Sequence, residues 1–158
     1  MIKKITALIC ILLCLCGCSK EEKFGLQQFA SRMNEQYSTT YKTADFMLGT
    51  DIENKKYFFY DSNDGFISLS LDSNNDIIGV SLLINESIDI NKGINTFLNI
   101  CCIFKGNDEK SEQKVFADCN INTDTIKYAD SNMVITIGKY KYTVICNDYS
   151  VTFFCDRV

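Results

Sequence analysis

The sequence contains no histidine, and this absence excludes much of the chemistry of enzymes. Without histidine a chain cannot build a histidine-based triad, a histidine general base or a histidine-ligated metal site. The chain also lacks the G-x-S-x-G motif, the phosphate-binding loop and the glycine-rich dinucleotide fingerprint. We therefore expect no catalytic residue and a function other than catalysis. An enzyme built on a carboxylate or thiol centre is the alternative.

Positive charge is also scarce, with 16 basic residues against 20 acidic ones. Only Arg32 and Arg157 are arginines. Binding to nucleic acid requires a basic face, so we expect no nucleic-acid partner. The hydrophobic content of 46% and the aromatic content of 12% predict a folded chain, and 158 residues suffice for one domain with a core.

A short apolar run occupies the N-terminus between Lys4 and Lys20. It extends from Ile5 to Cys16 and contains no charge. A basic start followed by such a run is the layout of a secretory signal. A membrane-spanning helix needs about 20 apolar residues, so this shorter run favours a cleaved signal over a permanent transmembrane anchor.

The stretch "LCGC", Leu15 to Cys18, closely resembles the lipobox of bacterial lipoproteins. In that motif an aliphatic residue, a small residue and glycine precede an invariant cysteine. The resemblance implies that Cys18 receives a diacylglycerol on its sulfur and becomes the first residue of the mature chain. We therefore expect a signal peptide over 1–17, a short tether over 18–23 and a single domain over 24–158.

A lipid on Cys18 makes the membrane a partner and implies an extracytoplasmic protein on the outer face of the cell membrane. Loss of residues 1–17 removes Lys3 and Lys4 and no acidic residue, so the net charge falls from -4 to -6. An acidic body is not attracted to an anionic bilayer. The acyl chains must therefore hold the protein there, and two or more chains are sufficient.

Five cysteines follow Cys18, and an odd number cannot pair completely. They are Cys101, Cys102, Cys119, Cys146 and Cys155. No CxxC motif occurs, and the adjacent Cys101 and Cys102 are poorly spaced for zinc, so we expect no metal site. Free thiols buried in the core are the favoured interpretation, and one disulfide from Cys101 to a cysteine of the sheet is the alternative.

Two segments with apolar residues at helical spacing predict amphipathic helices. The first contains Leu26, Phe29, Ala30, Met33 and Tyr37, and the second contains Ile94, Phe97, Leu98 and Cys101. Asp89 is a suitable N-cap for the second helix. An ambiguous segment follows each helix, and we expect a short strand over 44–49 and a helical turn over 109–119.

Further segments predict strands because short apolar or alternating runs are separated by turn sequences. They are residues 57–61, 66–71, 77–84, 125–129, 133–137, 140–146 and 151–155. Gly138 and Lys139 suit a two-residue hairpin with glycine at its first central position. The expected fold class is α+β, with a mainly antiparallel sheet and helices on one face.

The two halves of the domain, 24–88 and 89–158, share the order of a helix followed by a meander of strands. This order favours two tandem helix-plus-meander units. The layout resembles that of the β-lactamase inhibitor protein and of small envelope lipoproteins, although the chain carries no diagnostic motif of those families. An inhibitor of an extracellular enzyme is one specific form of the binding protein that we expect.

Asp72, Asn74 and Asp76 have the D-x-N-x-D rhythm of a calcium-binding loop. The remainder of that loop does not match, because Ile77 stands at the glycine position and Leu83 at the position of the bidentate glutamate. A hairpin turn explains the rhythm, and we expect no cofactor.

The sheet face opposite the helices is the candidate functional surface. If the hairpins have the simplest register, Val134, Thr143 and Phe154 form one cross-strand row on this face, with Ile145 beside it. On the first half this face is expected to carry only Ser68, Ser70, Gly79 and Ser81.

Val134, Ile145 and Phe154 are therefore the candidate interaction residues, because exposed apolar side chains with polar surroundings often mark a binding site. The expected function is a non-enzymatic binding or interaction module with a protein partner that the sequence does not identify. One alternative is that the segment around Val115 and Phe116 covers this face as a second core. Another is a purely structural protein of the cell envelope.

Overall fold

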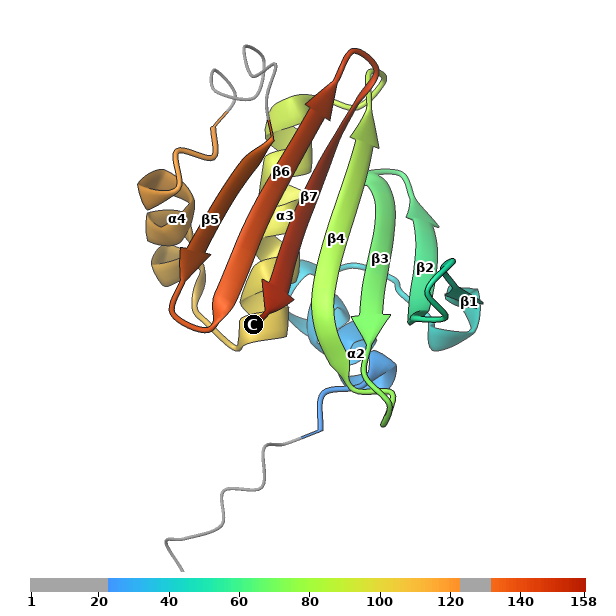
Figure 1. The fold of residues 1–158 in the computed structure, drawn as a ribbon. Coiled ribbons are helices and arrows are strands. Elements are labelled where there is room, and N and C mark those ends of the chain that lie inside the picture. Colours follow the sequence, from blue (N-terminus) through green and yellow to red (C-terminus); the bar gives the residue numbers. More distant parts are fainter. Residues whose placement is uncertain (1–22, 123–131) are drawn as a thin grey trace, which may run out of the picture.

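The part of the chain that the structure describes forms one antiparallel sheet of seven strands, with helices packed against one face (Figure 1). The computed structural model describes residues 23–122 and 132–158. The strands are β1 (Met47–Thr50), β2 (Lys56–Ser62), β3 (Gly65–Leu71), β4 (Ile77–Asn85), β5 (Met133–Ile137), β6 (Tyr140–Asn147) and β7 (Ser150–Arg157). The predicted α+β class with a mainly antiparallel sheet is therefore confirmed.

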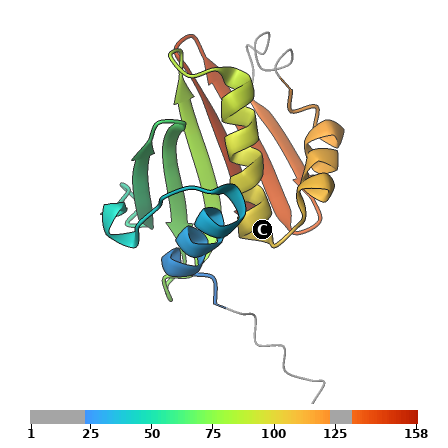
Figure 2. The ribbon, with the colours of Figure 1, turned by 180° about the vertical axis from the view of Figure 1, so that it is seen from behind.

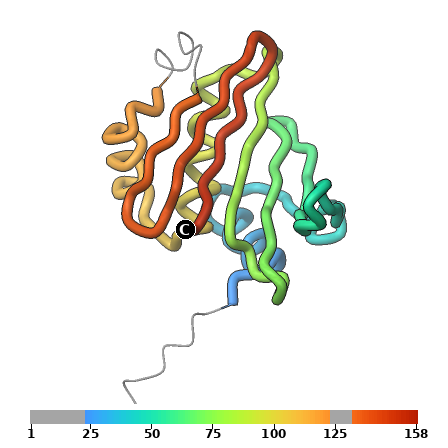
Figure 3. The backbone as a smooth tube through the Cα atoms, in the orientation of Figure 1, coloured from blue at the N-terminus to red at the C-terminus, as the bar shows by residue number. Residues whose placement is uncertain are grey.

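The strands lie in the order β1-β2-β3-β4-β7-β6-β5, and the tube in Figure 3 follows this order across the sheet. Each half of the chain therefore contributes a meander, and the last strand of one half pairs with the last strand of the other. The single β4–β7 ladder joins the two halves. The expected strand at 125–129 lies outside the described residues.

Helices α2 (Leu26–Tyr37), α3 (Ile90–Lys105) and α4 (Glu109–Asp118) all lie on the same face, which Figure 2 shows from the helix side. Asp89 caps α3 as predicted, since its Oδ1 atom accepts a hydrogen bond of 3.0 Å from the backbone N–H of Lys92. The predicted patterns of α2 and α3 are both helical in the structure.

The two ambiguous segments differ in part from the expectation. Residues 44–49 divide between a 3₁₀ turn, Thr43–Asp45, and the beginning of β1. Residues 109–118 form a helix of 10 residues instead of a single turn. Asp108 caps this helix by accepting from the Ser111 N–H at 2.9 Å, and the buried Phe116 holds it on the core.

The turns follow local side-chain chemistry. Gly138 has φ of 60°, a left-handed value that glycine adopts without strain, and the predicted two-residue turn joins β5 to β6. The β3–β4 turn is closed by Asp72, whose Oδ1 atom accepts from the N–H groups of Asn74 at 2.8 Å and Asp76 at 2.9 Å. Asp51 closes the β1–β2 turn in the same way.

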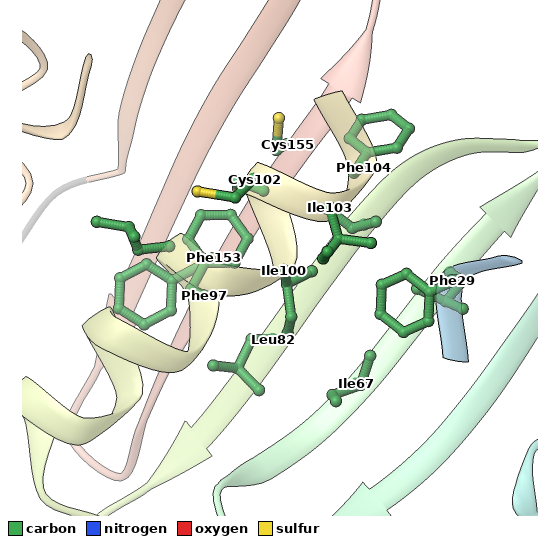
Figure 4. Packing of buried hydrophobic residues seen from close by; sticks show 14 of the residues in the cluster. Phe29, Ile67, Leu82, Phe97, Ile100, Cys102, Ile103, Phe104, Phe153 and Cys155 are labelled. Carbon is green, nitrogen blue, oxygen red and sulfur yellow. The ribbon is translucent and has the colours of Figure 1, made fainter. Parts of the chain in front are cut away.

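The core lies between the helices and the sheet, with α3 at its centre (Figure 4). The ring of Phe97 stacks on Phe153 of β7 with centroids 5.2 Å apart and contacts Phe116 of α4 at 5.7 Å. Phe29 brings α2 against the same core. Each such fully buried aromatic side chain contributes roughly 1.5–3 kcal/mol to folding.

A buried ion pair joins α3 and α4 to the sheet. The Nζ atom of Lys105 lies 2.7 Å from Oε2 of Glu112, and the two side chains are 5% and 0% exposed. The Tyr142 hydroxyl of β6 donates to Glu112 Oε1 at 2.6 Å and accepts from Lys105. Asn107 also donates to Glu112, at 3.2 Å. Each carboxylate oxygen therefore has a donor, which offsets part of the cost of burying the charges.

Glu112→Gln should lower the free energy of unfolding by about 3–5 kcal/mol, because it leaves the Lys105 ammonium buried without a counter-ion. Urea unfolding measures the loss. The double variant Lys105→Met with Glu112→Leu should recover most of it, since no charge is then buried. As a control, Asp118→Asn removes the exposed ion pair with Lys114 and should cost less than about 1 kcal/mol. A double variant as unstable as Glu112→Gln would contradict the charge argument.

Candidate functional site

The sheet face that Figure 1 presents to the viewer carries no helix. Across it the predicted row is present, because Val134 pairs with Thr143 and Thr143 pairs with Phe154. The row continues through Ser81 and Ser68 into the first half of the sheet. The candidate residues therefore share one face with the centre of the sheet.

The expectation that the segment around Val115 and Phe116 covers this face is wrong. Both residues belong to α4, on the opposite side of the sheet. The Phe116 ring contacts Phe97 at 5.7 Å and Tyr142 at 6.2 Å, both within the main core. No segment of 23–122 or 132–158 forms a second layer over the open face.

We call Val134, Ile145 and Phe154 the β5–β7 patch. Val134 is 56% exposed, whereas Ile145 and Phe154 are partly buried by their neighbours in the sheet. Thr143 lies between the patch residues in the cross-strand rows. The patch is thus apolar, interrupted by a hydroxyl, and open to solvent.

A second apolar patch lies on the first half of the sheet, where only small polar residues were expected. We call Phe59, Phe66 and Leu83 the β2–β4 patch. The rings of Phe59 and Phe66 lie 5.6 Å apart, and Phe66 pairs with Leu83 across the β3–β4 ladder. The sequence did not indicate this patch, because "YFFY" in β2 and "LL" in β4 show no alternation of apolar and polar residues.

A hollow of about 400 Å³ separates the two patches. Its floor is made by small residues on β3 and β4: Ser68, Ser70 and Ser81. The Tyr57 and Phe154 side chains line its two sides. A register shift between Ser70 and Leu71 brings Ile78 to its lower end. Such irregularities in a sheet often accompany a binding site.

Asp156 is the one acidic residue in the lining of this hollow. It pairs with Gly79 across the β4–β7 ladder, and a Cβ atom on Gly79 would collide with Asp156 Oδ1 and with Ser70 Oγ. The Asp156 carboxylate therefore lies over Gly79 at the border of the hollow. Burial raises the pKa of the Asp156 carboxyl above its usual range, and the Lys141 ammonium offsets only part of this effect.

Within 23–122 and 132–158, Asp156 makes no side-chain hydrogen bond and no ion pair. The sequence interpretation missed it because the outward set of β7 was followed only as far as Phe154. Continuing the same alternation by two residues would have placed Asp156 on the open face.

A thiol centre receives no support from the cysteines. All five are free in the structure, and only Cys146 is partly exposed. Burial raises the pKa of the thiols of Cys101, Cys102, Cys119 and Cys146. A nucleophilic cysteine needs the opposite shift. The Cys101 thiol contacts that of Cys155, so the alternative disulfide partner lies beside it, although the two are not bonded.

The calcium-like rhythm at Asp72, Asn74 and Asp76 serves the β3–β4 turn. One oxygen of Asp72 accepts two backbone N–H groups, and Asn75 adopts the left-handed conformation with φ of 63°. The β1–β2 turn has the same geometry, because one oxygen of Asp51 accepts two backbone N–H groups. The position after the aspartate is Ile52 in this turn and Ser73 in the β3–β4 turn. Among the residues that the structure describes, no group of three or more histidine, cysteine, aspartate or glutamate side chains could hold a metal ion.

A larger cleft of about 660 Å³ opens beside the β6–β7 turn and the N-terminus of α3. Three of its polar side chains are used by local turns and caps. Asp89 caps α3, Asn85 accepts from the N–H of Ser87, and Asn147 accepts from two N–H groups of its own turn. The cleft is therefore a weaker candidate than the open face, where the Asp156 carboxylate remains available.

Comparisons of the chain with protein-family models, with curated proteins and with solved structures gave no match. In the part of the chain that the structure describes, no helix combines the length and the apolar character needed to cross a bilayer. Cys18, the expected site of lipid attachment, lies outside the described residues.

Asp156→Asn should stabilise the protein at neutral pH. Because the pKa of Asp156 is raised in the folded state, the folded protein binds this proton more tightly than the unfolded chain does. The ionised carboxylate therefore opposes folding at pH 7, and the effect disappears below the usual pKa range of aspartate. The melting temperature should rise by on the order of 2 °C at pH 7 and change little at pH 3.

Asp61→Asn is the matched control for this measurement, because Asp61 is an exposed carboxylate on the same face. It should change the melting temperature less at both pH values. An equal gain from both substitutions would mean that overall charge, and not the burial of Asp156, sets the effect.

Proposed function

We propose that this protein is a lipid-anchored lipoprotein of the cell envelope that acts as a non-enzymatic binding module. A protein partner docks on the open face of the sheet. The single observation that carries the proposal is an uncovered sheet face with two apolar patches, the β5–β7 patch and the β2–β4 patch, on either side of a polar hollow.

The composition of this face fits protein recognition. Interfaces place aromatic and large apolar anchors at their centre, surrounded by polar groups that exclude water on binding. Here Phe59, Phe66 and Phe154 are fixed on strands of one sheet, so little conformational freedom is lost when a partner binds. Phe59 and Phe154 lie three strands apart, roughly 14 Å, which is a suitable width for a short segment of a partner.

The proposed anchor also limits where the partner can be. Between the lipidated Cys18 and Phe24, whose carbonyl oxygen accepts from the Ile77 N–H at 2.8 Å, lie only residues 19–23, which span at most about 18 Å when extended. The open face therefore stays close to the bilayer. A partner must be a membrane neighbour or a protein that reaches the membrane surface, such as an extracellular enzyme that this protein blocks.

Cys18→Ala should abolish lipidation and release the protein from the membrane fraction. The proposal rests on the basic start at Lys3 and Lys4, the short apolar run and the "LCGC" stretch. Intact-mass measurement of the native protein should give a chain that begins at Cys18 and carries acyl groups. A mature chain that begins at Met1, or a Cys18→Ala variant retained equally in membranes, would contradict the proposal.

The double variant Ile145→Ser with Phe154→Ser should reduce capture of the partner in cells at least tenfold, measured by crosslinking and mass spectrometry. Both side chains are only partly buried, so the loss of stability should stay below about 2 kcal/mol. Phe153→Ser is the matched control, because its fully buried ring faces the helices and its loss should cost more than about 3 kcal/mol. A double variant as unstable as Phe153→Ser would show that the patch belongs to the core.

A further inference from the structure

The hollow between the patches contains a charge without a counterpart. The floor of Ser68, Ser70 and Ser81 leaves room above the sheet, and the Asp156 carboxylate, which lies over Gly79, borders this room. A partly desolvated carboxylate that lacks a donor is costly, and a cation that enters the hollow would relieve that cost.

The charged groups around the hollow differ in whether they already have a partner. On one rim the Lys55 ammonium lies 2.7 Å from Glu53, and the Tyr57 hydroxyl donates to Asp51 at 3.0 Å. Lys141, the neighbour of Asp156 on β6, attracts the carboxylate but lies beyond ion-pair distance. These groups comprise three carboxylates and two ammonium groups, and Arg157, which also borders the hollow, makes the positive and negative charges equal in number.

Arg157 borders the hollow, but its guanidinium lies 5.9 Å from the ring centroid of Phe104, a residue of α3 on the helix side of the sheet. The serines of the floor are neutral and can accept hydrogen bonds from a cation.

We propose that the hollow receives a lysine or arginine side chain of the protein partner, with its cationic group on Asp156 and the floor serines and its stem between Tyr57 and Phe154. This assignment rests on the proposed function, since it specifies which side chain of the partner enters the open face.

The shape and chemistry of the hollow support this occupant. Aromatic rings attract cations through their faces and pack against methylene groups, so Tyr57 and Phe154 suit both parts of a long basic side chain. Arginine is enriched among the residues that dominate interfaces. An anionic group would be repelled by Asp156, and a neutral group would leave its charge unbalanced.

The test uses the full chain in detergent micelles, with two blocked tripeptides as probes. One is acetyl-Gly-Arg-Gly-amide, and the other carries citrulline, the neutral isostere of arginine, at its centre. The amide resonances of Ser70, Gly79 and Asp156 should shift on titration with the arginine peptide and remain in place with the citrulline peptide. The shifts should diminish as the pH is lowered through the titration of Asp156.

Asp156→Asn should weaken the response to the arginine peptide about tenfold or more, because it removes the charged acceptor. Asp61→Asn, which removes a charge from the same face outside the hollow, should weaken it less than twofold. Thermal unfolding of both variants confirms that they are folded.

The assignment would be overturned if the citrulline peptide bound equally well, or if Asp156→Asn responded to the arginine peptide as the unmodified protein does. It would also be overturned if glucose, a neutral polar probe, shifted the same amide resonances and the arginine peptide did not. The peptide titration requires neither a lipid anchor nor the natural partner. A negative peptide result would therefore not contradict the proposed binding function. Conversely, the result for partner capture by the Ile145→Ser, Phe154→Ser variant does not depend on the peptide result.

Discussion

The packing of α4 against α3 and the sheet depends on the buried contact of Lys105 with Glu112 and Tyr142. Helix α4 has few apolar residues of its own, with Phe116 as its only fully buried apolar side chain. The charge network supplies the second attachment, because it fastens the start of α4 to the end of α3 and to β6. Burial, the neighbouring Cys155 and the bond to Glu112 raise the pKa of the Tyr142 hydroxyl, which therefore remains protonated and can donate.

The helices leave the opposite face without a cover, and its residues reflect that exposure. A fully apolar open face would promote aggregation, whereas serines, threonines and glycine in its centre keep it compatible with water. Small residues weaken strands because they pack little surface. The serines among them create the hollow, so the strands lose some local stability where Ser68, Ser70 and Ser81 form a concave surface.

Much of the fold could be predicted from the sequence because its patterns are local. The spacing in α2 and α3, the cap at Asp89 and the turn at Gly138 each contain their own signal, and the structure has all of them. The full length of α4 was not predicted, because its buried Glu112 bonds to Tyr142, which lies 30 residues further along the chain. The β2–β4 patch was missed because consecutive apolar residues give no alternation, so only the strand register reveals which of them face outward.

The location of the hollow links the fold to its proposed function. Its floor belongs to β3 and β4 of the first half, and the wall that carries Phe154 and Asp156 belongs to β7 of the second half. These parts meet only through the β4–β7 ladder, where Ser81 pairs with Phe154 and Gly79 pairs with Asp156. Neither half could present an aromatic wall, a small-residue floor and a carboxylate alone. A binding site at this seam therefore requires both halves, which gives the central antiparallel pairing of the two meanders a functional role as well as a structural one.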